Sequence, residues 1–246
     1  MKRLRPIHVR PLEIWNAPVA GRPLCDWQLR EEFPEALAEL VQRLRHEHRF
    51  TRVHLLGGGA LRPGLASLLG ATVSTDPTFA AARAGSAQGI ACADVGQTAI
   101  KLVAGESTFT RARDLSRAPL INAPTRTPNA DATILNARES TLNFLAESLA
   151  PLAPLLSSSA MRPDACLLLA LPCELDDACN LSSCTYAWNP GDLAALLRAA
   201  GLAHERVLVL NDAELAALAV GSDPQTQTER TLVLTLGFGV GAALWR

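Results

Sequence analysis

The sequence predicts an α/β fold, because short apolar runs that suit strands alternate with longer stretches of helical period along the 246 residues. Hydrophobic residues make up 48% of the chain and charged residues 19%, which is enough apolar surface to bury a core. Three of the apolar runs lead directly into glycine-rich turns. The length fits one large domain or two small ones.

The first third of the chain is expected to contain short strands and one long helix. Residues 7–24 alternate apolar and polar positions among prolines, which suits short edge strands. Leu37 and Leu40 continue an apolar helical period, and Pro34 suits a first turn, so a helix is expected over 31–46. The other expected elements are a strand over Val53–Leu56, a helix over Pro63–Leu69, a strand over Ala71–Ser74 and a helix that starts at Asp76–Pro77.

The small residues of Gly85–Gly89 suggest a junction between two domains. The part that follows is expected to open with a strand meander and to continue as alternating helices and strands. The expected strands are Ile90–Asp94, Ala99–Ala104, a stretch around Ser107–Leu115, Cys166–Leu171, Arg206–Leu210 and Thr231–Thr235. The expected helices cover about 132–149, Pro190–Ala200 and 213–220, with loops at 123–130 and 174–190.

Charge and hydropathy argue against several classes of partner. The net charge of −1 disfavours a general nucleic-acid or membrane-surface role, so neither partner is expected. The basic start, Met1–Pro6, is not followed by an apolar segment, and no run reaches membrane-spanning length. We therefore expect a cytoplasmic location.

The six cysteines form no Cys-x-x-Cys pair. Cys92 and Cys166 fall in strand-like runs and are expected to be buried. Cys173, Cys179 and Cys184 are close in sequence, which leaves a thiolate metal site open, although structural zinc sites usually have tighter paired spacing.

The turn after the Ile90–Asp94 run has residue types that suit a phosphate with magnesium. The backbone N–H groups of Gly96, Gln97 and Thr98 and the Thr98 hydroxyl can meet phosphate oxygens. Asp94 at the strand end could hold a hydrated Mg²⁺, and Lys101 could reach a phosphate. An ordinary aspartate–glycine turn with a solvated lysine explains the same residues.

Two further turns and one polar pair complete the candidate set. Gly57–Gly59 follows the strand at 53–56, and Gly237, Gly239 and Gly241 follow the last expected strand. The alternatives are a ligand-free strand–helix turn for the first and a glycine-rich strand or bulge for the second. Asn211–Asp212 ends a strand and opens an alanine-rich helix, where capping of that helix is the alternative.

These motifs resemble the actin-like ATPase superfamily, which includes sugar kinases, heat-shock ATPases and actin. The similarity is greatest to the ROK-type and hexokinase-like sugar kinases. It implies an α/β, two-domain actin-like (ribonuclease H-like) fold with a nucleotide cleft between the domains. It also implies ATP and Mg²⁺ as cofactors. Gly96, Gln97, Thr98, Lys101, Gly237, Gly239 and Gly241 would bind the phosphates, Gly57, Gly58 and Gly59 the adenosine, and Asp94 the metal through water.

The resemblance also assigns the acceptor site. It implies Asp212 as the general base for the accepting hydroxyl and Asn211 as a contact to a sugar. Phe238 stands where the family has threonine, and Cys173 stands where it usually has glycine. The family's Glu-x-Gly-His segment has no counterpart at residues 8–30, where the order of elements would place it.

The order of the motifs differs from that of the superfamily, in which the aspartate-containing turn comes first and the adenosine turn comes near the end. Here the adenosine-like turn comes first, which indicates a circular permutation. The expected domains are 1–88 plus 226–246, with the adenosine turn and the second phosphate turn, and 89–225, with the first phosphate turn and the acceptor site.

The expected function is phosphoryl transfer from ATP to a sugar or similar small hydroxyl acceptor, with Asp94 and Asp212 in the catalytic site. Two alternatives stay open, a nucleotide-binding regulator or degenerate kinase without turnover, and an actin-like assembly ATPase. A homodimer is compatible with the sequence.

Overall fold

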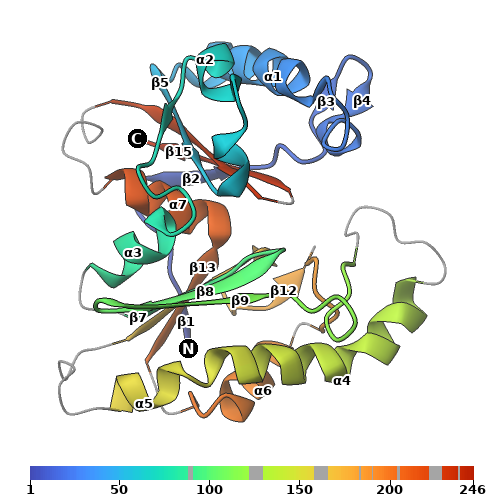
Figure 1. The fold of residues 1–246 in the computed structure, drawn as a ribbon, viewed down its shortest axis with the longest axis vertical. Coiled ribbons are helices and arrows are strands. Elements are labelled where there is room, and N and C mark those ends of the chain that lie inside the picture. The colour runs from blue at the N-terminus through green and yellow to red at the C-terminus, as the bar shows by residue number, and fades with distance from the viewer. Residues whose placement is uncertain are drawn as a thin grey trace. The chain divides into compact units, whose positions relative to one another are not determined.

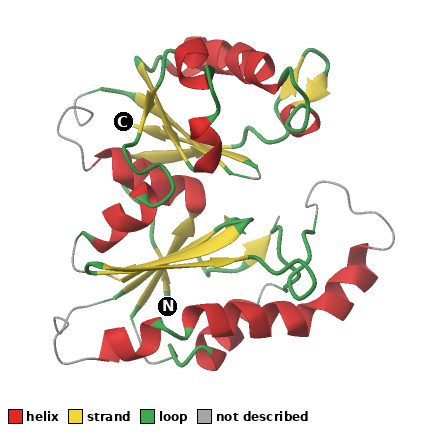
Figure 2. Cartoon of the chain, in the orientation of Figure 1, coloured by secondary structure: helices red, strands yellow, loops and turns green. Residues whose placement is uncertain are grey.

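The computed structural model describes residues 1–87, 91–121, 130–157, 166–182, 184–189, 191–203, 206–221, 229–237 and 239–246. It has a mixed α/β architecture with several sheets (Figures 1 and 2). Among the described residues, no helix combines the length and the apolarity that a membrane crossing requires.

The chain forms two compact units, each assembled from segments that are distant in sequence. Unit 1 comprises Met1–Leu4 and Gly85–Asp212, and unit 2 comprises Arg5–Ala84 and Ala213–Arg246. These bounds differ from the expected ones at Met1–Leu4, which was expected in the other domain, and at the second junction, which follows Asp212 instead of residue 225. Met1–Leu4 belongs to unit 1 because Lys2 and Arg3 pair with the strand that ends at Asn211.

Unit 1 contains a six-stranded sheet in the order β1-β13-β10-β7-β8-β9. Its strands are β1 (Lys2–Arg3), β7 (Ala91–Val95), β8 (Ala99–Ala104), β9 (Ser107–Ala112), β10 (Leu167–Leu171) and β13 (Val207–Asn211), and a small hairpin is formed by β11 (Glu174–Leu175) and β12 (Leu181–Ser182). Its helices α4 (Ala130–Leu149), α5 (Leu152–Ser157) and α6 (Asp192–Ala199) lie along one face of the sheet (Figure 1). Their apolar side chains share one core with alternate residues of β7, β8, β10 and β13.

Unit 2 contains a five-stranded sheet in the order β2-β15-β14-β5-β6. Its strands are β2 (Val9–Leu12), β5 (Arg52–Leu56), β6 (Thr72–Val73), β14 (Thr231–Leu236) and β15 (Val240–Trp245), and a hairpin is formed by β3 (Pro18–Val19) and β4 (Arg22–Pro23). Its helical segments are η1 (Leu24–Asp26), α1 (Phe33–His48), η2 (Gly58–Leu61) and α2 (Leu65–Leu69). Helix α1 packs on one face of this sheet.

Two helices connect the units along the chain. Helix α7 (Asp212–Gly221) packs against the other face of the unit 2 sheet, where Ala216, Ala217 and Val220 meet Val233 and Ala243. Helix α3 (Ala80–Ser86) ends at the boundary between the units. Its Gly85 lies against Leu168 and Cys92 of the unit 1 sheet, so the small residues of this segment allow a close approach.

Five strands have the same arrangement in both sheets, and β1 is an additional edge strand of the unit 1 sheet. In unit 1, β7 pairs antiparallel with β8 and β8 with β9, while β10 and β13 continue the other side of β7 in parallel. In unit 2, β14 pairs antiparallel with β15 and β15 with β2, while β5 and β6 continue the other side of β14 in parallel. The first two strands of this pattern, β14 and β15, come last in the chain of unit 2.

Most of the elements expected from sequence are confirmed, including the long helix over 31–46, which is observed as α1. Its amphipathic spacing buries Leu37 and Leu40, and the chain leaves the helix at Arg49 in a left-handed conformation. The expected loop at 174–190 contains the β11–β12 hairpin, and α5 and β15 were not anticipated. These elements are short or continue directly from a glycine turn, so they lack a clear periodic signal.

Glu147 connects α4 to the edge strand of the unit 1 sheet. Its carboxylate accepts hydrogen bonds from Arg117 at 2.7 and 2.9 Å and from Arg111 of β9 at 3.0 Å. Hydrogen bonds from Arg117 and then Arg111 lower the pKa of Glu147 to about 2. Because the pKa is lowered in the folded state, this pairing stabilises the protein above the ordinary glutamate pKa, and the stabilisation is lost as the pH falls toward 2.

We predict that Glu147→Gln lowers Tm at neutral pH and that the difference from the wild type shrinks as the pH falls below about 4.5. Thermal unfolding of both proteins across this range measures it. Glu139→Gln, at an exposed position of the same helix, is the control and should leave Tm unchanged throughout. A difference that does not depend on pH would contradict the prediction.

Candidate functional site

The carboxyl ends of three parallel strands bring the expected residues of unit 1 to one edge of the sheet. Ala170 of β10 pairs with Asp94 of β7 on one side and with Leu210 of β13 on the other. Asp94 and the Asn211–Asp212 pair therefore lie two strand spacings apart, about 10 Å. Ligands of open α/β sheets bind at this kind of edge.

Asp94 and Lys101 form an ion pair at this edge. They are cross-strand partners in β7 and β8, and the Lys101 Nζ lies 2.9 Å from the Asp94 Oδ2. Both side chains are largely buried, with 10% of Asp94 and 18% of Lys101 exposed. The ammonium group offsets the cost of removing the carboxylate from water. The two charged residues expected to meet metal and phosphate thus contact each other.

The turn from Gly96 to Thr98 has all three of its carbonyl groups occupied. Gly96 O accepts from the Tyr186 hydroxyl at 2.7 Å, Gln97 O from the Arg113 Nη1 at 3.2 Å and Thr98 O from the Arg113 backbone N–H at 2.8 Å. The Gly96 N–H closes the turn onto Ala99 O at 3.0 Å. Within the described part of the chain, the N–H groups of Gln97 and Thr98 have no protein acceptor.

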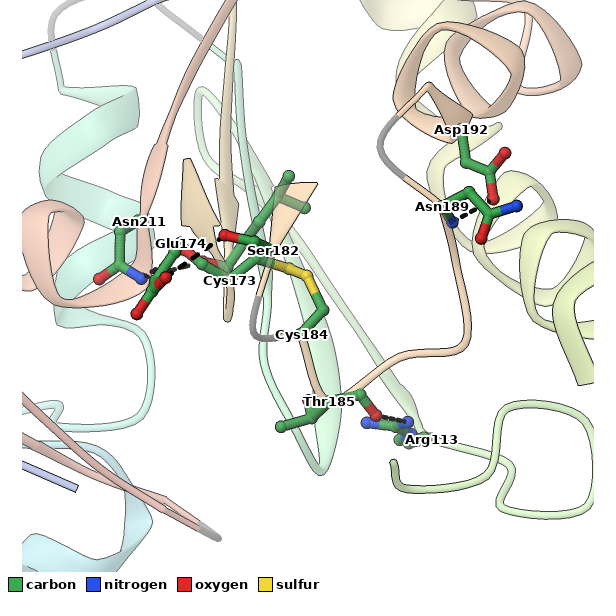
Figure 3. Close-up of a disulfide and its surroundings, with 10 residues drawn as sticks. Arg113, Cys173, Glu174, Ser182, Cys184, Thr185, Asn189, Asp192 and Asn211 are labelled. Carbon is green, nitrogen blue, oxygen red and sulfur yellow. Dashed lines mark hydrogen bonds between the residues drawn. A yellow bond between two sulfur atoms is a disulfide. The ribbon is translucent and has the colours of Figure 1, made fainter. Parts of the chain in front are cut away.

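Asn211 lies where β10 ends, and its side chain is oriented by the backbone there. The Asn211 Nδ2 donates to Cys173 O at 2.9 Å and, more weakly, to Leu171 O at 3.5 Å (Figure 3). Asp212 follows as the first residue of α7. The strand pairing therefore places both expected acceptor-site residues at the same sheet edge as Asp94.

A disulfide between Cys173 and Cys184 closes the segment that carries the β11–β12 hairpin (Figure 3). It uses two of the three sulfur atoms considered for a thiolate metal site, and Cys179 is buried as a free thiol. Burial raises the pKa of that thiol. Among the described residues, no group of three or more metal-ligating side chains is present.

The first glycine turn of unit 2 lies against Leu236, the residue from which the second glycine turn continues. Their strands, β5 and β14, are parallel neighbours, so Gly57–Gly59 and Gly237 follow strand ends at the same sheet edge. A Cβ atom at Gly57 would lie 2.4 Å from Leu236 O, and one at Gly59 would lie 3.0 Å from it. Glycine is therefore required for this close backbone approach.

A pocket of about 500 Å³ opens beside these two turns, within unit 2. Its size suits a small organic ligand. The lining residues are Gln28, Leu29, Phe33, Gly58, Gly59, Leu61, Arg62, Leu236, Gly237, Gly239 and Val240. Gly241 instead pairs with Thr235 inside the β14–β15 hairpin, and Phe238 lies outside the described residues.

Part of the site was not predicted from sequence. Gln28 and Leu29 reach the pocket from the turn that precedes α1, and Phe33 reaches it from the first residue of that helix. The Arg62 guanidinium lies 5.7 Å from the Phe33 ring. No short-range motif marks them. Arg113 is also not marked by any motif, yet it is only 8% exposed, and four backbone carbonyl groups surround its guanidinium.

Comparisons with protein-family models, with curated proteins and with solved structures find no match to this chain.

We predict that Gly57→Ala destabilises the protein and distorts the pocket. Gly57 has φ 86° and ψ 165°, a region that only glycine adopts readily, at a cost of about 1–3 kcal/mol for other residues. The contact with Leu236 O adds to this cost. Chemical denaturation measures the effect, and Gly58→Ala is the matched control, because its Cβ would meet no atom within 4 Å. Equal stability of the two variants would refute the prediction.

Proposed function

We propose that this chain is an ATP-dependent phosphotransferase that acts on a sugar or a similar small hydroxyl acceptor. The proposal includes a circularly permuted actin-like fold with a nucleotide cleft between its two domains. It places ATP and Mg²⁺ with the glycine turns and the acceptor with Asn211 and Asp212.

The observation that carries the proposal is the repeated strand arrangement of the two sheets. In each sheet a glycine turn follows the strand that begins the meander, after β7 in unit 1 and after β14 in unit 2. A superfamily with two related domains and two phosphate turns has this pattern. The late position of β14 and β15 in the chain supports the permuted order.

The pocket of unit 2 supports the position of the adenosine. Leu29, Phe33 and Leu61 provide apolar surface for a base, while Gln28 and Arg62 provide polar groups. Gly58 and Gly59 leave room for a ribose to lie against the backbone. The neighbouring Gly237 and Gly239 would meet the phosphates.

The edge of unit 1 supports the phosphate and metal assignment. Mg²⁺ prefers one or two carboxylates together with water and substrate phosphates, and Asp94 fits this requirement as the carboxylate that holds it through water. When bound, the ion would neutralise part of the negative charge of the phosphates. Lys101 would then move from Asp94 toward a phosphate oxygen.

The chemistry assigned to this edge is a direct transfer. The acceptor hydroxyl oxygen bonds to the γ-phosphorus, the bond from that phosphorus to the bridging oxygen breaks, and ADP leaves with the electron pair. Asp212 takes the hydroxyl proton, and Asn211 positions the acceptor.

A nucleotide-binding protein without turnover is the second candidate. The observation that favours it is Phe238, which lacks the hydroxyl that the kinase family has at this position. This candidate binds ATP or ADP but transfers no phosphoryl group.

We predict that Asp212→Asn lowers acceptor-dependent ADP release from Mg·ATP by roughly 10²–10⁴-fold, with the KM for ATP little changed, because a general base is lost. A coupled ADP assay over a panel of hexoses and amino sugars measures it. Glu106→Gln, in an exposed turn, is the control and should retain full activity.

The other outcomes of this assay, together with a measurement of nucleotide binding, distinguish the phosphotransferase from the alternative functions. Full activity of Asp212→Asn removes Asp212 from the role of base. Nucleotide binding without turnover in the wild type favours the second candidate, and turnover without any acceptor favours an assembly ATPase.

We also predict that Lys101→Met weakens Mg·ATP binding by about 10–100-fold but leaves adenosine binding unchanged, because a charged phosphate contact is lost. Isothermal titration calorimetry with both ligands measures it. Lys101 and Lys2 are the chain's two lysines, so Lys2→Met is the matched control. Equal losses for ATP and adenosine would show a general structural defect instead.

A further inference from the structure

Arg113 is a buried cation that is bonded to backbone carbonyl groups. Its Nε donates to Ala118 O at 2.6 Å, and its Nη2 donates to Pro119 O and Thr185 O at 2.7 Å each. Its Nη1 donates to Gln97 O at 3.2 Å. Within the described part of the chain no carboxylate pairs with it, so uncharged groups, four of them backbone carbonyl groups, compensate its burial.

Tyr186 completes this arrangement from the opposite side. Its ring lies 3.6 Å from the Arg113 Cζ, and its hydroxyl donates to Gly96 O at 2.7 Å. Burial raises the pKa of Tyr186 to about 12, so the hydroxyl remains a hydrogen-bond donor at neutral pH.

We propose that Arg113 and Tyr186 are positioning residues that aim the N–H groups of Gln97 and Thr98 at the polyphosphate of a nucleotide. The identity of this anion rests on the proposed function.

The geometry of the peptide bond explains how Arg113 and Tyr186 orient these N–H groups. Gly96 C=O and Gln97 N–H belong to one planar trans peptide, so they point in opposite directions. Tyr186 holds that carbonyl and thereby directs the Gln97 N–H away from itself. Arg113 holds Gln97 C=O and directs the Thr98 N–H in the same manner. Successive N–H groups presented in this way form an anion-binding turn.

The charge of this region also favours an anion. Asp94 is neutralised by Lys101, whereas Arg113 contacts four carbonyl groups and the Tyr186 ring, and no carboxylate pairs with it among the described residues. One positive charge is therefore left beneath the turn, and its field is weakly screened because the group is buried.

The test is a titration of ¹⁵N-labelled protein with inorganic tripolyphosphate, followed by the amide signals of Gln97 and Thr98. We expect both signals to shift in the wild type. Tyr186→Phe keeps the ring beside Arg113 and removes only the hydroxyl, so we expect roughly 5-fold weaker binding at the same signals. In ADP release, this variant should raise the KM for ATP and leave the acceptor KM unchanged.

Ser86→Ala is the matched control. It removes a buried hydroxyl of unit 1 that has no partner among the described residues and does not contact Arg113, and we expect wild-type affinity. Arg113→Lys is a second variant, which keeps the positive charge but loses the planar fork. We expect the amide signals of Gln97 and Thr98 in this variant to differ from those of the wild type.

Absence of shifts at Gln97 and Thr98 in the wild type would overturn this inference without recourse to any variant. Unchanged affinity of Tyr186→Phe would also overturn it. Shifts that weaken as expected, without acceptor-dependent ADP release, would support the positioning role and reject the phosphotransferase.

Discussion

Unit 2 depends on the pairing of β14 with β5, which joins residues from opposite ends of the sequence into one sheet. Thr231 pairs with Arg52 and Thr235 with Leu56, and the Glu229 carboxylate meets the Arg52 Nε at 2.8 Å just before the strand begins. Alternate side chains of β14 face α1 on one side and α7 on the other. Neither core of this unit can therefore be completed until β14 has joined β5, a contact of high sequence separation that is slow to form.

The same pairing creates the pocket, because it brings two glycine turns together at one sheet edge. Leu236 O takes the space that a side chain at Gly57 would need, so backbone atoms pack directly against each other beside the pocket. Unit 1 holds its own turn differently, with side-chain donors from Arg113 and Tyr186 on the turn carbonyl groups. One turn is thus fixed by steric contact and the other by hydrogen bonds.

Much of the secondary structure could be predicted from sequence, because short-range patterns determine it. The period of Leu37 and Leu40 and the apolar run before Gly57 each need only local information. Two other features depend on tertiary contacts. Spacing does not reveal which of Cys173, Cys179 and Cys184 form a disulfide. The pocket residues at 28–33 and the burial of Arg113 arise from loops that are distant in sequence.

The buried position of Arg113 changes how the candidate phosphate turn should be understood. A glycine-containing turn between two strands can present either carbonyl or N–H groups, and residue types alone do not determine which. Here every carbonyl of Gly96, Gln97 and Thr98 is already bonded inside the protein. The groups left for a ligand are therefore hydrogen-bond donors, beside an arginine whose charge no described carboxylate balances. Such a turn attracts anions and disfavours cations, which limits its ligands to phosphate-like or carboxylate-like groups.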